Sequence, residues 1–252
     1  MKPILIAAAI LAAGSACAQT QTPEEQSRAT EAWSPVPARV DTSGLVPSDA
    51  VVLFDGKSLS GWQTVKDGSA AKWTLAGGAM TVKAGAGDIQ TRESFCDVQL
   101  HVEWRTPTVV TDPDGKELQS QARNNSGVFL QGLYEVQVLD SYGKAATYVN
   151  GQAGSVYKQS IPLVNASRAP GVWQAYDIIY HAPRFDGAGV VTQKARITVL
   201  HNGVLVQDDF EIEGPTAWIG HPAYAAHGCA PLSLQDHGNP VSYRNIWIRK
   251  LD

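Results

Sequence analysis

Residues 96–105 constrain the fold of this chain more than any other stretch. Its apolar residues Cys96, Val98, Leu100, Val102 and Trp104 alternate with the polar residues Asp97, Gln99, His101, Glu103 and Arg105. Because successive side chains of a strand point to opposite faces, this alternation predicts a strand that covers a hydrophobic core. We therefore expect His101 and Glu103 to face solvent or a groove.

Many other short runs of β-branched and aromatic residues are separated by Gly, Asn and Pro. Asn202-Gly203 lies between two such runs and predicts a hairpin of residues 194–200 and 204–210, because both turn residues tolerate positive φ. A second hairpin is expected across residues 76–79. The other expected strands are 72–75, 80–83, 126–131, 134–139, 173–181, 232–235 and 242–249. This pattern, with no convincing core helix, predicts an all-β fold, a two-sheet antiparallel jelly-roll sandwich.

The first 18 residues have the layout of a cleavable secretory signal. Lys2 precedes an apolar run at 4–13, and small residues lead to a cleavage site after Ala18. That run, like every later one, is shorter than the roughly 18 apolar residues of a membrane helix. We expect a soluble periplasmic or secreted protein. The alternative is a lipoprotein anchored through Cys17, although Gly14 stands where such signals usually carry Leu.

Residues 19–48 have the composition of a flexible linker, being rich in Thr, Pro, Ser, Ala and Glu without apolar periodicity. Thr22 as cap and Pro23 in the first turn predict one short polar helix there. The remaining residues, 49–252, are expected to form a single domain. No internal repeat is present, and the length leaves no room for a second domain.

Cysteine content and charge limit the classes of partner and compartment. If Cys17 is removed with the signal, Cys96 and Cys229 are the remaining cysteines, in a compartment where disulfides persist. The sequence allows either a disulfide between them or two buried free thiols. The net charge of −4 comes without a basic stripe, which argues against a nucleic-acid partner. The sequence carries no signal for an oligomeric state.

Aromatic residues favour a carbohydrate partner. The chain has seven Trp and eight Tyr but only five Phe, a preference for rings that carry a polar group. Such rings stack on the apolar faces of pyranoses while neighbouring polar groups bind hydroxyls. Many of them must also fill the core.

Two stretches gather polar groups that could carry chemistry. On a strand over 134–139, Glu135 and Gln137 project from the same face, with a solvated surface as the structural alternative. Further along, Gln235, His237, Arg244 and Asn245 place an acid or base, a cation and two amides within a few residues. A lone His is more often structural, but one among such neighbours is better placed to act.

Several motifs are similar to those of one known family. They are Leu53-Phe54-Asp55-Gly56-Lys57-Ser58-Leu59-Ser60-Gly61-Trp62, Asn125-Ser126-Gly127-Val128-Phe129-Leu130, the run from Tyr134 to Asp140, Gly154-Ser155-Val156-Tyr157, Gly171-Val172-Trp173-Gln174, Asn202-Gly203, Leu234-Gln235-Asp236-His237-Gly238 and Tyr243-Arg244-Asn245-Ile246. In this order, from about Val51 to the C-terminus, they resemble the 3-keto-disaccharide hydrolase family.

The chain departs from the family pattern in three places. Gln131 stands where an Arg or similar residue is frequent, and Tyr243 where Phe is commoner. The insert at 108–121 is longer than usual, so we expect a different groove edge. These departures bear on the choice of substrate more than on the fold.

The resemblance implies a concanavalin A-like jelly roll that acts on glycosides whose C3 hydroxyl is oxidised to a ketone. A 3-keto group acidifies the C2 proton, so the group attached through the glycosidic oxygen can leave by elimination. Addition of water then completes a net hydrolysis. Glu135 and His237 are the expected base and acid, without an assignment of which is which. Arg244, or a divalent metal held partly by Glu135 and His237, would stabilise the enolate. The expected substrate-binding residues are Asn125, Gln137, Asp140, Tyr157, Gln235 and Asn245.

A more distant similarity to laminarinase-type glycosidases makes ordinary hydrolysis unfavourable. Those enzymes place carboxylates at alternate positions of one strand, where this chain has Glu135, Gln137 and Leu139. With Leu139 in the place of the acid, two-carboxylate hydrolysis lacks its proton donor. A non-catalytic lectin-like module and a structural sheet protein of the cell envelope are the competing interpretations. The residues do not specify the aglycone, the linkage or a metal.

Overall fold

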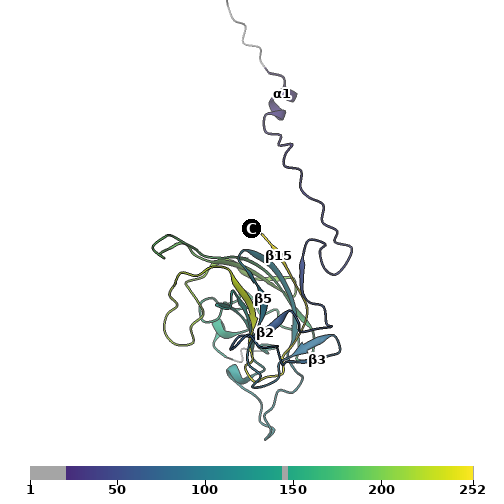
Figure 1. Ribbon diagram of the computed structural model, residues 1–252, viewed down its shortest axis with the longest axis vertical. Coiled ribbons are helices and arrows are strands. Elements are labelled where there is room, and N and C mark those ends of the chain that lie inside the picture. The colour runs from purple at the N-terminus through teal and green to yellow at the C-terminus, as the bar shows by residue number, and fades with distance from the viewer. Residues whose placement is uncertain (1–20, 144–146, 252) are drawn as a thin grey trace, which may run out of the picture. The chain divides into compact units, whose positions relative to one another are not determined.

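The computed structural model describes residues 21–143 and 147–251. They divide into two compact units, with the boundary between Arg39 and Val40. In the first unit, helix α1 (Pro23–Arg28) confirms the predicted short helix, and Thr22 is its cap (Figure 1). The Thr22 hydroxyl accepts from the Glu25 N–H and the Glu25 carboxylate accepts from the Thr22 N–H, which forms a capping box. The expected signal at 1–18, with Cys17, lies outside the described residues.

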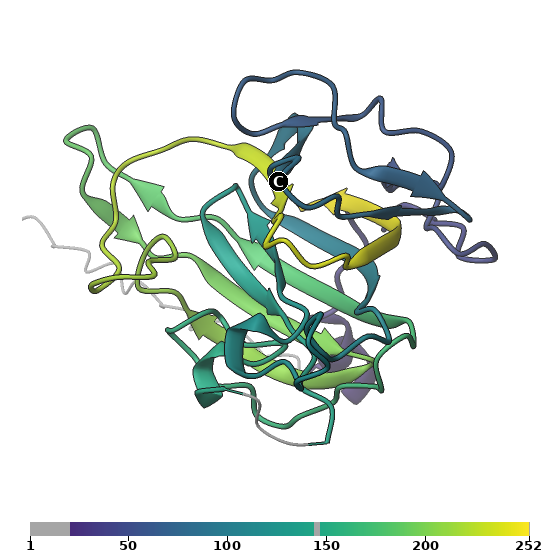
Figure 2. The same cartoon turned by 90° about the horizontal axis from the view of Figure 1, so that it is seen from below.

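The second unit is a sandwich of antiparallel sheets, as predicted (Figures 1 and 2). The large sheet has the order β13 (Val204–Glu211), β12 (Arg196–His201), β9 (Gln174–His181), β6 (Val98–Arg105), β15 (Ser242–Lys250), β4 (Ala79–Thr81) and β3 (Thr74–Ala76), with β1 (Val51–Phe54) also paired to β15. The small sheet has the order β2 (Trp62–Thr64), β5 (Ile89–Phe95), β14 (Ala230–Leu234), β7 (Ser126–Leu130) and β8 (Tyr134–Val138). A separate ribbon joins β10 (Arg184–Phe185) to β11 (Val191–Gln193), and the single-turn 3₁₀ helices are η1 (Ser120–Ala122) and η2 (Val149–Gly151). None of the helices in the described ranges is both long and apolar enough to cross a membrane.

Strand β6 shows the alternation expected from its sequence. Val98, Leu100, Val102 and Trp104 are buried, and the residues between them are half-buried on the outer face. The Asn-Gly hairpin is present between β12 and β13, with φ of 55° at Asn202 and 79° at Gly203. Strand β5 was not predicted, because its central residues Arg92, Glu93 and Ser94 are all exposed and break the alternation.

Three buried tyrosines of the large sheet bind the small sheet through their hydroxyl groups. Tyr176 donates to the carbonyl of Gln137 at 2.7 Å, and Tyr180 to the side-chain oxygen of Gln131 at 2.8 Å. Tyr243 donates to the Ser126 hydroxyl at 2.7 Å. Because these hydroxyls are enclosed in the core, their bonds also satisfy groups that would otherwise be costly to bury.

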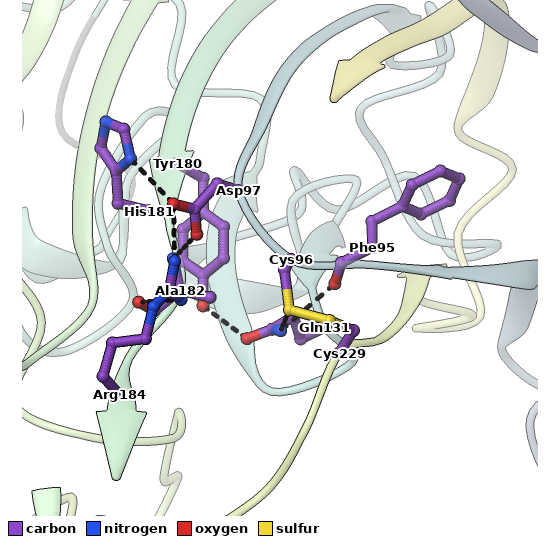
Figure 3. A network of polar contacts seen from close by, with 9 residues as sticks. All are labelled: Phe95, Cys96, Asp97, Gln131, Tyr180, His181, Ala182, Arg184 and Cys229. Carbon is purple, nitrogen blue, oxygen red and sulfur yellow. Dashed lines mark hydrogen bonds and ion pairs between the residues drawn. A yellow bond between two sulfur atoms is a disulfide. The ribbon is translucent and has the colours of Figure 1, made fainter. Parts of the chain in front are cut away.

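A disulfide and an amide fix the start of β14 against the turn between β5 and β6. Cys96 and Cys229 are bonded, which resolves the alternatives left open by the sequence. Gln131 lies beside them, with its side-chain nitrogen donating to the carbonyl of Phe95 (Figure 3). The same nitrogen also donates to the carbonyl of Gly228. The Gln131 amide therefore joins residues next to both ends of this disulfide to Tyr180 of the large sheet.

The middle of β15 contains an irregularity in its pairing with β6. Register shifts between Arg244 and Trp247, and Asn245 has a φ of 45°. The side chain of Asn245 donates to Glu103 at 2.9 Å and lies 3.3 Å from Nε2 of His101. Extra residues of this kind kink a strand and redirect its side chains. The sequence predicted that Glu103 faces solvent or a groove. Glu103 does line a cavity on this face.

Candidate active site

A cavity of about 600 Å³ lies on the face of the small sheet that is turned away from the core. This volume is within the ~300–1,000 Å³ range of small-molecule sites. Its lining residues are Gln121, Asn125, Phe129, Glu135, Gln137, Tyr157, Thr216, Trp218, Gln235 and His237. Six of the nine residues that the sequence nominated are therefore brought together, namely Asn125, Glu135, Gln137, Tyr157, Gln235 and His237.

The floor of this cavity comes from strands β7 and β8. Tyr134, Val136 and Val138 of β8 point into the core, so Glu135 and Gln137 project from the opposite face. They are not on a solvated face, because only 4% of Glu135 and 1% of Gln137 are exposed. Leu139 is fully buried, follows the last residue of β8 and does not line the cavity.

Gly127 on β7 provides the space for the Glu135 side chain. A Cβ at this glycine would lie 2.6 Å from Oε1 of Glu135 and 2.6 Å from the ring of Phe129. Both distances are far below a normal contact between non-bonded heavy atoms. The absence of a side chain at position 127 therefore determines where the carboxyl group can lie.

The walls of the cavity are loops that hydrogen-bond directly to β8. Tyr157 donates its N–H to the carbonyl of Glu135 at 3.1 Å, so the loop after η2 covers what would otherwise be an open strand edge. At the same edge, the Glu135 N–H donates to the Thr216 hydroxyl at 3.0 Å. The two walls therefore share one anchor, the backbone of Glu135.

Burial raises the pKa of Glu135 to about 8, and the nearby Asp88 carboxylate contributes in the same direction. Within the described chain, no group donates a hydrogen bond to the carboxyl oxygens of Glu135. The carboxyl group is thus open to a ligand and exchanges its proton near neutral pH. These are the properties of a general acid or base.

Asp88 and Asp236 hold the turn that carries His237. The Asp236 N–H donates to Asp88 at 2.7 Å, and Asp236 accepts in return from the Gly87 N–H at 2.9 Å. Burial raises the pKa of Asp88, and the adjacent Asp236 carboxylate raises it further. His237 is exposed at the rim of the cavity and lowers that pKa electrostatically, which places it near Asp88.

Amide side chains form a connected row along one side of the cavity. The Gln137 nitrogen donates to the Asn125 side-chain oxygen at 2.8 Å, and the Asn125 nitrogen donates to the side-chain oxygen of Gln121 at 3.0 Å. Gln121 ends the insert 108–121 that we expected to alter the groove edge, and it lines the cavity. The nitrogens of this row are occupied, so the row offers acceptors to ligand hydroxyls.

Tyr157 brings a phenol into the same cavity. Its hydroxyl is 2.5 Å from the hydroxyl of Tyr148, which is 41% exposed. Burial raises the pKa of Tyr157, and Tyr148 and Glu135 add to the effect. The phenol is therefore neutral and able to donate. If Tyr148 donates to Tyr157, the Tyr157 proton is available for a ligand.

The remaining three nominated residues lie elsewhere. Arg244 and Asn245 are on the outer face of the large sheet and line a second cavity together with Glu103. Arg244 donates to Glu103 at 2.6 Å and stacks 4.2 Å from the ring of Trp173. Asp140 is buried in an ion pair with Arg123, at 3.0 Å, and does not line the main cavity. Arg244 is thus not positioned to act on a ligand beside Glu135.

The residues present do not form a recognisable metal site. Glu135 and His237 share the cavity, but no group of three or more His, Cys, Asp or Glu side chains is arranged for a metal in the chain as described. A catalytic zinc site usually has three protein ligands of these types. We therefore derive no chemical step through a metal.

Four lining residues were not nominated from the sequence: Gln121, Phe129, Thr216 and Trp218. Phe129 is the cross-strand partner of Glu135 and stands in one of the quoted motifs, which could have identified it. Thr216 and Trp218 belong to the long connection between β13 and β14 and carried no periodic signal.

The chain is similar to several known proteins. Residues 49–249 match the family described as the 3-keto-alpha-glucoside-1,2-lyase-like domain. The 3-keto-disaccharide hydrolase of Bacteroides thetaiotaomicron is 26% identical over 244 residues, which cover 82% of this chain and 81% of that protein. A crystal structure of a proposed glycosyl hydrolase from Parabacteroides distasonis superposes with a TM-score of 0.84 at 49% identity, covering 92% of this chain and 99% of the other. A second one from that organism has a TM-score of 0.58 at 21% identity, covering 81% and 94%, and supports the fold alone.

Proposed function

Since the chain belongs to the 3-keto-alpha-glucoside-1,2-lyase-like family, we propose that it cleaves 3-keto-glycosides by elimination at C1 and C2 followed by hydration. The observation that carries this proposal is Glu135, a buried carboxyl group with a pKa of about 8. It is the one carboxylate among the described residues that line the cavity. A retaining or inverting glycosidase needs two such groups.

The proposed reaction uses the ketone to make the C2 proton removable. Glu135 takes that proton as carboxylate, the electron pair forms the enolate, and collapse of the enolate breaks the bond between C1 and the glycosidic oxygen. The departing oxygen takes up a proton. Water then adds its hydroxyl to C1 and a proton to C2 of the enone, which gives the products of a net hydrolysis.

The positions of the other groups suggest their roles. His237 is at the exposed rim of the cavity, where the leaving sugar would lie, and we assign it the proton donor. The Tyr157 hydroxyl is the donor best placed for the enolate oxygen, in place of the distant Arg244. A neutral phenol held by a second phenol supplies this stabilisation without the cost of burying a charge. The amide row is assigned to the sugar hydroxyls.

We also propose that the protein works outside the cytoplasm. The disulfide between Cys96 and Cys229 supports this location, because such bonds persist in oxidising compartments. Intact-mass measurement of the exported protein would check the start at Gln19, and a lipid adduct on Cys17 would favour the anchored alternative.

The test compares a 3-keto-glucoside with the same glucoside before oxidation. We expect cleavage of the keto form alone, with deuterium at C2 either lost to water or slowing the reaction. Glu135→Gln should abolish both exchange and cleavage, while His237→Ala should reduce cleavage more than exchange. Comparable cleavage of the unoxidised glucoside with full retention of deuterium would contradict elimination. Binding without any cleavage would support the lectin-like alternative.

A further inference from the structure

Trp218 is an exposed aromatic side chain at the mouth of the cavity that contains Glu135. It is 73% exposed, and the neighbouring Ile219 is 78% exposed. Exposed apolar side chains are informative when they adjoin one another or border a ligand-binding cavity. Trp218 nevertheless lines the same cavity as Glu135, which is only 4% exposed. The cavity therefore runs from a buried carboxyl group to an open indole ring.

The loop that carries Trp218 is held in place on both sides. Lys158 donates its ammonium group to the Trp218 carbonyl at 2.6 Å, and the Gln159 side chain donates to the carbonyl of Gly214 at 3.0 Å. Two residues before Trp218, the Thr216 hydroxyl accepts from the Glu135 N–H of β8, and the Thr216 N–H donates to the carbonyl of Leu133 just before β8. An exposed ring on a loop with this many anchors is preorganised for a ligand, which reduces the entropy lost on binding.

From these contacts we propose that Trp218 is a stacking platform for the leaving-group sugar and selects glycosides whose aglycone is a second pyranose ring. This proposal rests on the proposed function. If the reacting 3-keto ring lies over Glu135, the sugar on the other side of the glycosidic oxygen extends toward the mouth. There the indole can cover the apolar face of that sugar, while the amide row lies deeper in the cavity.

The test measures how much of the specificity for the aglycone depends on the indole ring. Trp218→Ala should lower kcat/KM for a 3-keto disaccharide about tenfold, chiefly by raising KM. For the methyl 3-keto-glucoside, which has no second ring, the same variant should change kcat/KM less than about twofold. Trp218→Phe should restore most of the activity on the disaccharide. Trp33→Ala is the matched control, because Trp33 is 81% exposed and is not one of the residues that line the cavity.

An equal loss for both substrates, or no loss for the disaccharide, would overturn the platform. A binding measurement distinguishes failure of the platform from failure of the proposed function. If the wild-type protein cleaves neither keto compound, calorimetric titration with the unoxidised disaccharide still has to show about tenfold weaker binding for Trp218→Ala. Unchanged binding, or no binding by either protein, would overturn the platform in that case as well.

Discussion

At the scale of single residues, the ionisation of Glu135 links stability to activity. Its pKa is raised from 4.5 to about 8, so the folded protein holds a proton that the unfolded chain releases. This stabilisation is complete below pH 4.5 and is lost as the pH rises through about 8. Activity should follow the opposite trend, because the carboxylate is the base, and should increase toward pH 8.

Glu135→Gln removes this titration while keeping the shape of the side chain. Denaturant unfolding should show that the free energy of unfolding decreases between pH 4.5 and 8 in both proteins. The decrease should be smaller in the variant than in the wild type, by on the order of a few kcal/mol. The slope that remains should come from Asp88, whose pKa is also raised, and from other groups. Identical pH profiles for the two proteins would contradict an ionisable, buried Glu135.

Gly127→Ala tests the space beside the carboxyl group. The new methyl group would compete with Oε1 of Glu135 and with the Phe129 ring, both 2.6 Å from the ideal Cβ position. We expect kcat to fall about 100-fold through displacement of the carboxyl group, with binding of the product sugar less affected. A circular dichroism spectrum matching the wild type would show that the sheet survives. Unchanged kcat in a folded variant would mean that the position of the carboxyl group is not critical.

At the scale of elements, the irregularity of β15 depends on Asn245. Its φ of 45° is unfavourable for most residues, and its amide donates to Glu103 on the outer face. Asn245→Ala should lower the free energy of unfolding by about 2 kcal/mol, from backbone strain and a lost hydrogen bond. Asn245→Gly should lose less, because glycine adopts this φ freely. Urea midpoints of the two variants would measure this order, and the reverse order would refute it.

The elements that could be predicted are those whose pattern is local. The alternation in β6 and the Asn-Gly turn depend only on neighbouring residues, and both are present. The common face of Glu135 and Gln137 followed from the strand period, but their burial did not, because the covering loops come from distant segments. Closeness in sequence also led to the grouping of His237 with Arg244, which the structure does not bring together. Between His237 and Arg244 the chain passes from the small sheet to the large one, so the two residues occupy different faces.

At the scale of the whole molecule, the disulfide closes a long part of the chain. Cys96 and Cys229 are 133 residues apart, and closing a segment of this length restricts the unfolded chain strongly. Replacing both with Ser should reduce the free energy of unfolding by about 4–5 kcal/mol if the effect is mainly entropic. Reductant should lower the free energy of unfolding of the wild type by the same amount and leave that of the variant unchanged, as measured by thermal unfolding. Equal stability of oxidised and reduced wild type would contradict this role.

The origin of the cavity's parts has a consequence for how such proteins can diversify. The floor is made of strand residues whose backbones are bonded on both sides, and core tyrosines fix those strands from behind. The mouth is made of loop residues such as Trp218, which enter neither sheet. Substitutions or insertions around Trp218 can therefore change which sugars are accepted without moving Glu135, the proposed base. A lineage could in this way acquire new substrates by small sequence changes while its chemistry stays constant.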